Sequence, residues 1–113
     1  MNEERMEIVM GIIMHGGNAK GLAFQAIQQA KDGDFEAAEK SLQESNQELL
    51  QAHDVQTDML TKEAQGIHTE IDLYMVHAQD HLMNSITFKD LATEIISQEK
   101  RIQALEKAAN YYR

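Results

Sequence analysis

Residues 71–86 have the sequence IDLYMVHAQDHLMNSI, and the interpretation of the whole chain depends on them. Three chemically active side chains, His77, Asp80 and His81, fall within five residues. An α-helix turns by about 100° per residue, so residues at i, i+3 and i+4 share one face. If the stretch is helical, these three side chains lie together, with Asn84 one turn further on. An imidazole beside a carboxylate is typical of a nucleophile, a base or a metal ligand.

The composition limits the class of protein. A length of 113 residues is typical of one domain, so we expect residues 1–113 to form a single domain. The absence of Pro fits long uninterrupted helices. The absence of Cys excludes disulfides, a thiolate zinc site and a cysteine nucleophile within this chain. With 19 acidic and 10 basic residues and a formal net charge of -9, nucleic acids and anionic membrane surfaces are poor partners.

The chain has no sequence that predicts membrane insertion. Its longest apolar run, residues 8–14, contains Gly11 and is far shorter than the ~20 residues that a membrane span requires. The N-terminal residues MNEERMEI include acids where a signal peptide has bases. We therefore expect a soluble, cytoplasmic protein.

Apolar periodicity predicts two helices, over residues 3–31 and 35–64. Between them, Gly33 can adopt the left-handed conformation that ends a helix, and Asp34 can cap the next one. The first helix contains four glycines, each of which costs about 1 kcal/mol relative to Ala. We interpret them as places where another helix approaches closely, in preference to a surface lowered for docking near His15: Gly11, Gly16, Gly17 and Gly21.

A third helix is predicted over residues 70–108. Thr69 followed by Asp72 resembles a capping box, and residues 110–113 have no pattern and are expected to fray. The helix has two apolar rows, although a three-helix hairpin buries only one broad stripe per helix. The row expected to be buried is Ile71, Met75, Ala78, Leu82 and Ile86. The second row starts polar and becomes apolar: His77, His81, Asn84, Phe88, Leu91, Ile95 and Ile102.

These rows predict an all-α protein, a three-helix antiparallel bundle. The second row needs a further partner, most simply copies of itself, which indicates a symmetric oligomer with the third helices inside. A row left half exposed at the edge of a single bundle is the alternative.

Four chemical interpretations of the His77–Asp80–His81 group compete. A polar patch without chemistry is the commonest outcome of such spacing. A transition-metal site lacks both the His-Glu-x-x-His motif and the Glu-x-x-His pairs of di-iron bundles. A hydrolytic triad lacks Gly-x-Ser-x-Gly. A phosphohistidine carrier needs a neutral imidazole and a partner for its second ring nitrogen, for which His81, Gln79 or a backbone carbonyl is available. Spacing alone does not choose between the patch and the carrier.

Four stretches of the chain resemble one known family. Residues 76–83, VHAQDHLM, are similar to the phosphorylation-site signature of the enzyme IIA components of the lactose/cellobiose/chitobiose branch of the bacterial phosphotransferase system. Further similar stretches occur in the same order: EIVMGII at 7–13, QAKDGDF at 29–35 and AHDVQT at 52–57. The resemblance extends from about Glu7 to Lys107, and the upstream half is more similar to cellobiose/chitobiose members than to lactose members.

The resemblance implies a role for His77. It implies that His77 accepts a phosphoryl group from the carrier HPr and passes it to a cysteine of the cognate enzyme IIB. A disaccharide of the cellobiose/chitobiose or lactose type is then phosphorylated as it enters through enzyme IIC. His81 and Gln79 are expected to support His77, whereas His15, His53 and His68 are expected to be dispensable.

The resemblance also implies a homotrimer of nine helices with the third helices at its axis. Asp80 from each subunit is then expected to bind one divalent cation, Mg²⁺. Three carboxylates in one buried place need such compensation, and a hard cation with oxygen ligands supplies it. The alternative function is a non-enzymatic helical scaffold oligomer in which this axial metal site is only structural.

Overall fold

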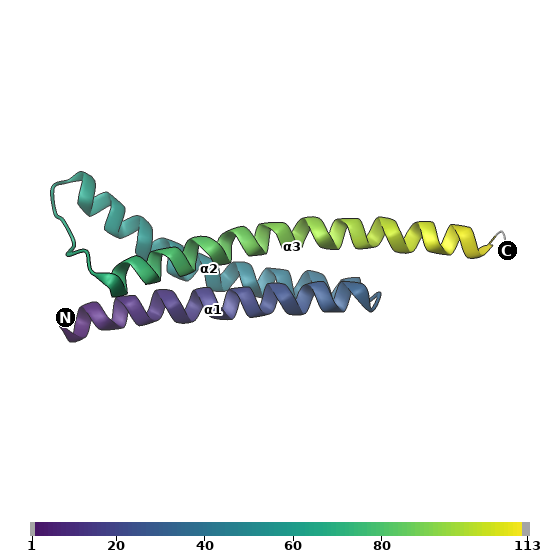
Figure 1. The fold of residues 1–113 in the computed structure, drawn as a ribbon, viewed down its shortest axis with the longest axis horizontal. Helices are drawn as coiled ribbons and strands as arrows, with labels where there is room; N and C mark the ends of the chain where they lie inside the picture. The colour runs from purple at the N-terminus through teal and green to yellow at the C-terminus, as the bar shows by residue number, and fades with distance from the viewer. Residues whose placement is uncertain (1, 112–113) are drawn as a thin grey trace.

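A computed structural model describes residues 2–111 as three α-helices, with no strand in that range (Figure 1). The helices are α1 (Glu3–Lys31), α2 (Phe35–Ala64) and α3 (Leu73–Tyr111). Helices α1 and α3 run in the same direction and α2 runs in the opposite one, which gives an up–down–up bundle in which α1 packs against both other helices. The bundle is a rod of 66 × 24 × 20 Å. No helix of the described part is long and apolar enough to cross a membrane.

The corner between α1 and α2 is formed as the sequence predicts. Gly33 has a φ of +83°, the left-handed conformation expected there. The Ala37 N–H donates to Oδ1 of Asp34 at 3.1 Å, so Asp34 caps α2. The observed bounds of α1 and α2 coincide with the predicted ones, because both ends of this corner are defined by local side chains.

The start of α3 differs from the prediction. The helix begins at Leu73 and not at residue 70, because Asp72 itself is the cap: the Met75 N–H donates to Oδ1 of Asp72 at 2.9 Å. Thr69 has another role, since its hydroxyl accepts a hydrogen bond from Nη1 of Arg5 at 2.6 Å. The hydrogen bond from Met75, together with Arg5, lowers the pKa of the Asp72 carboxyl below its usual value.

The end of α3 also differs from the prediction. The helix continues to Tyr111, past the expected end at residue 108, so fraying is the wrong prediction for residues 110 and 111. Tyr112 and Arg113 lie outside the described residues. Gln103 of α3 donates to the Ala30 carbonyl at 2.8 Å, close to the end of α1. The C-terminal end of α3 therefore extends past the other two helices (Figure 1).

The core is narrow and rich in alanine. Its buried residues form two groups along the rod, and small side chains let the helices approach closely. Ser45 of α2 is buried, and its hydroxyl donates to the Ala19 carbonyl at 2.6 Å. The first group is Val9, Ile12, Ala19, Leu49, Ala52, Met75, Ala78 and Leu82. The second is Ala23, Ala26, Ile27, Ala30, Ala38, Leu42, Ala92 and Ile96.

Only two of the four α1 glycines are places of close approach. A Cβ on Gly16 would lie 3.3 Å from Cδ2 of His81, and one on Gly17 would lie 3.4 Å from Nε2 of the same ring. A Cβ on Gly11 or Gly21 would have no neighbour within 4 Å. The close-approach interpretation is therefore right for Gly16 and Gly17 and wrong for Gly11 and Gly21.

The two predicted rows of α3 need correction. Met75, Ala78 and Leu82 are buried as expected, but Ile71 precedes the helix and is exposed. The second row does not lie on one exposed face, because His81 and Phe88 are half-buried. The face directed away from the bundle instead has Asp80 at its centre: Leu73, Val76, Asp80, Met83, Leu91, Ile95, Ile102 and Leu105, all exposed. We call this set the α3 outer face.

Candidate functional site

His77 and His81 lie one turn apart on α3 with their rings offset-stacked. The ring centroids are 6.0 Å apart and the planes are inclined by 20°, within the range of a stacked aromatic pair. The His77 ring is exposed, whereas His81 is half-buried against α1. One imidazole is therefore presented to solvent, and the other is placed beneath it.

The position of His81 depends on the two glycines of α1. Gly16 and Gly17 leave the space that the His81 ring occupies, as the 3.3 and 3.4 Å distances show. On the α3 side, the Ser85 hydroxyl donates to the His81 carbonyl at 2.8 Å. The sequence points to both the glycines and His81 but does not connect them, because they are 64 and 65 residues apart.

Asp80 is exposed at the centre of the α3 outer face. It has no ion pair among the described residues, and apolar Val76 and Met83 lie beside it on the same face. Within residues 2–111, no group of three His, Cys, Asp or Glu side chains is arranged to bind a metal ion. One subunit therefore supplies a single carboxylate, and a metal site at Asp80 requires further copies of the chain.

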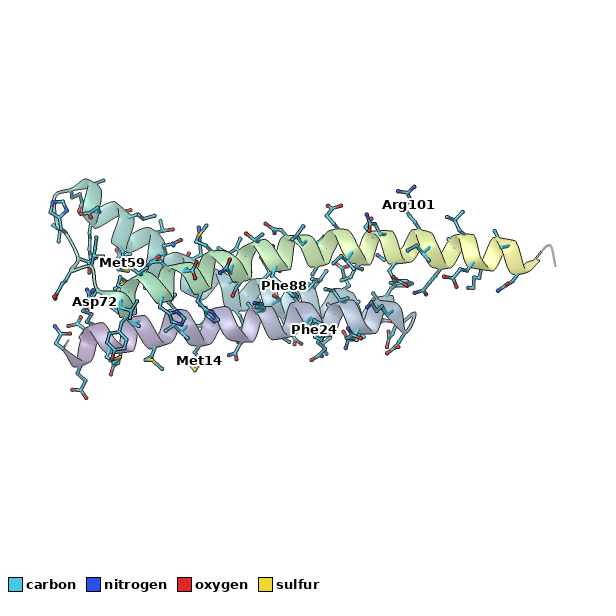
Figure 2. All side chains as sticks on the ribbon, in the orientation of Figure 1. Met14, Phe24, Met59, Asp72, Phe88 and Arg101 are labelled. Atoms are coloured by element: carbon cyan, nitrogen blue, oxygen red, sulfur yellow. The ribbon has the colours of Figure 1, made fainter. Side chains whose placement is uncertain are left out.

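Gln79 lies on the flank of α3 opposite His77. Its Oε1 accepts a hydrogen bond from Nε2 of Gln56 in α2 at 2.6 Å. The pair lines a largely apolar groove of about 490 Å³ between the end of α2 and the start of α3. Figure 2 shows Met59, which also lines this groove, on the part of α2 that diverges from α3. Among the described residues of one subunit, the hydrogen bonds of Gln79 go to Gln56, Met59 and Met75, and none goes to His77.

The other three histidines lie outside this group. Nδ1 of His15 is 2.5 Å from Oε2 of Glu48, a contact that joins α1 to α2. His68 pairs with Glu63 near the end of α2. His53 is exposed on α2.

A search of known families finds a match over most of the chain. The family described as "PTS system, Lactose/Cellobiose specific IIA subunit" matches residues 7–100, which include His77, Asp80 and His81. The chain belongs to this family. The expectation drawn from residues 76–83 and the three other stretches is confirmed.

Individual relatives support the same conclusion. The PTS system galactose-specific EIIA component of Lactococcus lactis subsp. cremoris is 68% identical over 105 residues, which are 93% of this chain and 90% of the relative. The cellobiose-specific EIIA component of Lactococcus lactis subsp. lactis is 67% identical with the same coverage. The chain is thus a IIA component of the phosphotransferase system, of the cellobiose/chitobiose/lactose type.

The fold matches solved structures of the family. The solution structures of the IIA(Chitobiose)–HPr complex of Escherichia coli contain a chain that is 40% identical. It superimposes with a TM-score of 0.78 over 90% of this chain and 99% of that chain. The three-helix IIA fold is therefore shown.

Proposed function

We propose that this IIA protein is a phosphoryl carrier in which His77 is the acceptor. It takes the group from phospho-HPr and passes it to a cysteine of a cognate enzyme IIB. The observation that supports this most directly is the exposed His77 ring stacked on the half-buried His81 ring. A partner protein can reach the outer ring, while His81 limits its rotation.

The proposed transfer is an exchange of one P–N bond for another. A lone pair on a ring nitrogen of neutral His77 attacks phosphorus in line with the donor's P–N bond. The donor nitrogen leaves with the electron pair of the broken bond and takes up a proton. In the second transfer a cysteine thiolate of enzyme IIB forms a P–S bond as the bond to His77 breaks.

The charges around His77 fit a carrier. No Lys or Arg occurs between residues 73 and 81, within a turn on either side of His77. A strongly cationic site would stabilise the phosphorylated protein and slow release of the group. The complex of a 40% identical IIA with HPr supports HPr as the donor.

The α3 outer face supports a homotrimer with the α3 helices at its axis. Leu91, Ile95 and Ile102 are 57%, 39% and 46% exposed in one subunit. A row of exposed aliphatic side chains along one helix is typical of an oligomer interface. Three copies related by a closed rotation would bury the face in nine helices in all.

Three-fold symmetry also suggests how Gln79 supports His77. When three parallel helices surround an axis, one flank of each helix meets the opposite flank of the next. His77 is on one flank of α3, and Gln79 is on the other. The Gln79 amide that approaches a given His77 then belongs to the neighbouring subunit.

The same symmetry brings three Asp80 carboxylates together. Apolar neighbours and helix packing would keep water from screening them, so a hard divalent cation such as Mg²⁺ suits the site. The residues fit such an ion only as a set of three, since one subunit provides one carboxylate. The cation would neutralise charge at the axis.

The transported sugar is proposed to be a disaccharide of the cellobiose/chitobiose or lactose type. The galactose-specific and cellobiose-specific relatives are almost equally similar, at 68% and 67% identity. A carrier that exchanges phosphoryl groups with proteins has no contact with the sugar. The cognate enzymes IIB and IIC therefore determine the substrate.

The decisive experiment is phosphoryl transfer in a purified system. We expect incubation with phosphoenolpyruvate, enzyme I and HPr to add the mass of one phosphoryl group per subunit, and enzyme IIB to remove it. No added mass would contradict the proposal and leave the scaffold oligomer, which membership of the family does not favour.

A further inference from the structure

The side-chain amide of Gln79 is held by a hydrogen bond from α2. Its Oε1 accepts from Nε2 of Gln56 at 2.6 Å, and both side chains are half-buried. If the Gln79 amide alone turned by 180°, its NH2 group would face the NH2 group of Gln56, and both are donors. The orientation of Gln79 therefore depends on Gln56.

Three methionine sulfurs fix the direction of this hydrogen bond. Nε2 of Gln79 lies 3.5 Å from Sδ of Met75 and 4.0 Å from Sδ of Met59. Nε2 of Gln56 lies 3.8 Å from Sδ of Met83. A thioether sulfur is a weak acceptor and has no proton to donate, so an N–H group is favoured beside it over a carbonyl oxygen. The Gln79 amide therefore directs its oxygen to Gln56 and its NH2 group to the sulfurs.

The NH2 group of Gln79 can be transferred to a stronger acceptor. Its hydrogen bonds to sulfur are weak, whereas a hydrogen bond to an ionised phosphoryl oxygen is roughly twice as strong as one between neutral groups. The carbonyl oxygen of the same amide would repel a phosphoryl oxygen, because both are acceptors. The orientation that Gln56 imposes is thus the one that favours a phosphoryl group nearby.

The groove around Gln79 opens onto the proposed trimer interface. Val76, Asp80 and Met83 line this groove and also belong to the α3 outer face. Around the helix, Gln79 is about 100° from Asp80 on one side, and His77 is about 60° from it on the other. Along the helix, Gln79 and His77 differ in height by only about 3 Å. Three parallel α3 helices would therefore place His77 of one subunit at the mouth of the next subunit's groove.

We propose that Gln56 is a positioning residue for phosphoryl transfer. By donating to Oε1 of Gln79, it keeps the NH2 group of Gln79 available to the phosphoryl group on His77 of the neighbouring subunit. The inference rests on the proposed function and adds a residue of α2 that acts through Gln79 alone. It predicts that the direction of the Gln56–Gln79 hydrogen bond matters, and not only its presence.

The measurement is the equilibrium constant for phosphoryl exchange between phospho-HPr and this protein. This constant reports how well the phosphorylated form is stabilised, and it does not depend on how the two proteins dock. In Gln56→Glu, at about pH 8, the ionised carboxylate can only accept, so the Gln79 amide has to turn and present its oxygen to the phosphoryl group. We expect the constant to fall at least about tenfold, the size of one lost hydrogen bond to a charged group.

Two further variants of Gln56 separate direction from charge and from simple loss of the contact. In Gln56→Lys the ammonium can only donate, so Gln79 keeps its orientation, and the constant should stay near the wild-type value. Gln56→Met has a side chain of similar length without an N–H group. It leaves the Gln79 amide free to turn, so the constant should fall, but by less than in Gln56→Glu.

Leu60→Glu is the matched control for the added negative charge. Leu60 lines the same groove and is 62% exposed, so the substitution places a carboxylate in the groove at a residue that forms no hydrogen bond with Gln79. The constant should fall much less in Leu60→Glu than in Gln56→Glu. Equal decreases in these two variants would show that charge alone is responsible and would overturn the inference.

Mixed trimers test the path between subunits. When Gln56→Glu subunits are refolded with an excess of His77→Ala subunits, each intact His77 is next to a subunit with the native Gln56–Gln79 pair. We expect the constant for this His77 to return to near the wild-type value. A constant as low as in the pure Gln56→Glu trimer would contradict an action across the interface.

The outcomes separate this inference from the proposed function. If wild type accepts no phosphoryl group from phospho-HPr, the proposed function fails. If wild type accepts it and the constants of Gln56→Glu, Gln56→Met and Gln56→Lys are equal, the proposed function stands and the positioning role of Gln56 is wrong.

Discussion

The rings of His77 and His81 are stacked with their centroids 6.0 Å apart, and the inner ring lies against Gly16 and Gly17 of α1. His77 is thus stacked on His81, and the His81 ring packs against α1 where Gly16 and Gly17 have no side chain. This arrangement makes the α1 glycines part of the site.

Gly16→Ala tests that support. The new Cβ would lie 3.3 Å from Cδ2 of His81 and 3.4 Å from Oγ of Ser85, so the ring has to shift by a few tenths of an ångström. Gly11→Ala is the control, because its Cβ is in open space. Denaturant unfolding should show a gain of up to about 1 kcal/mol for Gly11→Ala and a smaller gain or a loss for Gly16→Ala. Transfer from HPr should slow only in Gly16→Ala, and equal gains with equal rates would contradict the account.

Replacement of Asp72 should reveal a pH-dependent cap. The Met75 N–H and then Arg5 lower the pKa of Asp72 from its ordinary value of 3.8. A carboxyl whose pKa is lower in the folded state stabilises the fold above its unfolded pKa, and loses this contribution as pH falls through the folded pKa. Asp72→Asn keeps a side-chain oxygen for the cap but has no charge.

Melting curves of wild type and Asp72→Asn over a pH series measure this contribution, because other titrating groups are common to both. Wild type should have the higher Tm near neutral pH, and the difference should shrink as pH falls below 3.8. A difference that stays constant down to about pH 2 would show that the charge of Asp72 is not involved.

How far the sequence predicts the fold depends on how local each signal is. The corner at Gly33 and Asp34 is encoded within four residues, and the observed helix ends there match the prediction. The start of α3 was misplaced because Thr69 bonds to Arg5, 64 residues away, leaving Asp72 to cap the helix. Sequence spacing cannot show a partner at that distance.

In the site, too, local sequence signals predict well, whereas contacts between distant residues are not predicted. Residues 76–83 were enough to place the chain in its family, and the match over residues 7–100 confirms it. The second row of α3 was wrong in part, because a repeat of three and four residues does not show where α1 crosses α3. His81 and Phe88 face α1, and Asp80 takes their place on the outer face.

The trimer predicts a specific response of the α3 outer face. Leu91→Ala, Ile95→Ala and Ile102→Ala should cost little in an isolated subunit, where these side chains are partly exposed. In the assembly they would be buried, and each truncation should cost about 2–5 kcal/mol per site. Sedimentation at micromolar concentration should show wild type as a trimer and the variants dissociating.

Ile67→Ala is the matched control, because Ile67 is exposed to a similar degree in the connection between α2 and α3. This variant should remain a trimer. A well-folded wild-type monomer at micromolar concentration would contradict the assembly.

Chelation should distinguish the two effects that Asp80 has on the trimer, which are cation binding and repulsion between carboxylates. With a bound cation, wild type gains stability by linkage, and removal of the ion leaves three carboxylates that repel one another. Asp80→Leu removes both the ligands and the repulsion, so its trimer should melt at the same temperature with and without EDTA. Wild type should melt lower with EDTA. An unchanged wild-type Tm, or an equal decrease in both proteins, would exclude the axial cation.

The most direct test of the central claim, that His77 is the phosphoryl acceptor, is the intact mass of wild type, His77→Ala and His81→Ala after reaction with phosphoenolpyruvate, enzyme I and HPr. Wild type should gain one phosphoryl group per subunit. His81→Ala should gain it more slowly, because it loses only an orienting partner, and His77→Ala should not gain it at all. A phosphoryl group on His77→Ala at a rate near that of wild type would contradict the account.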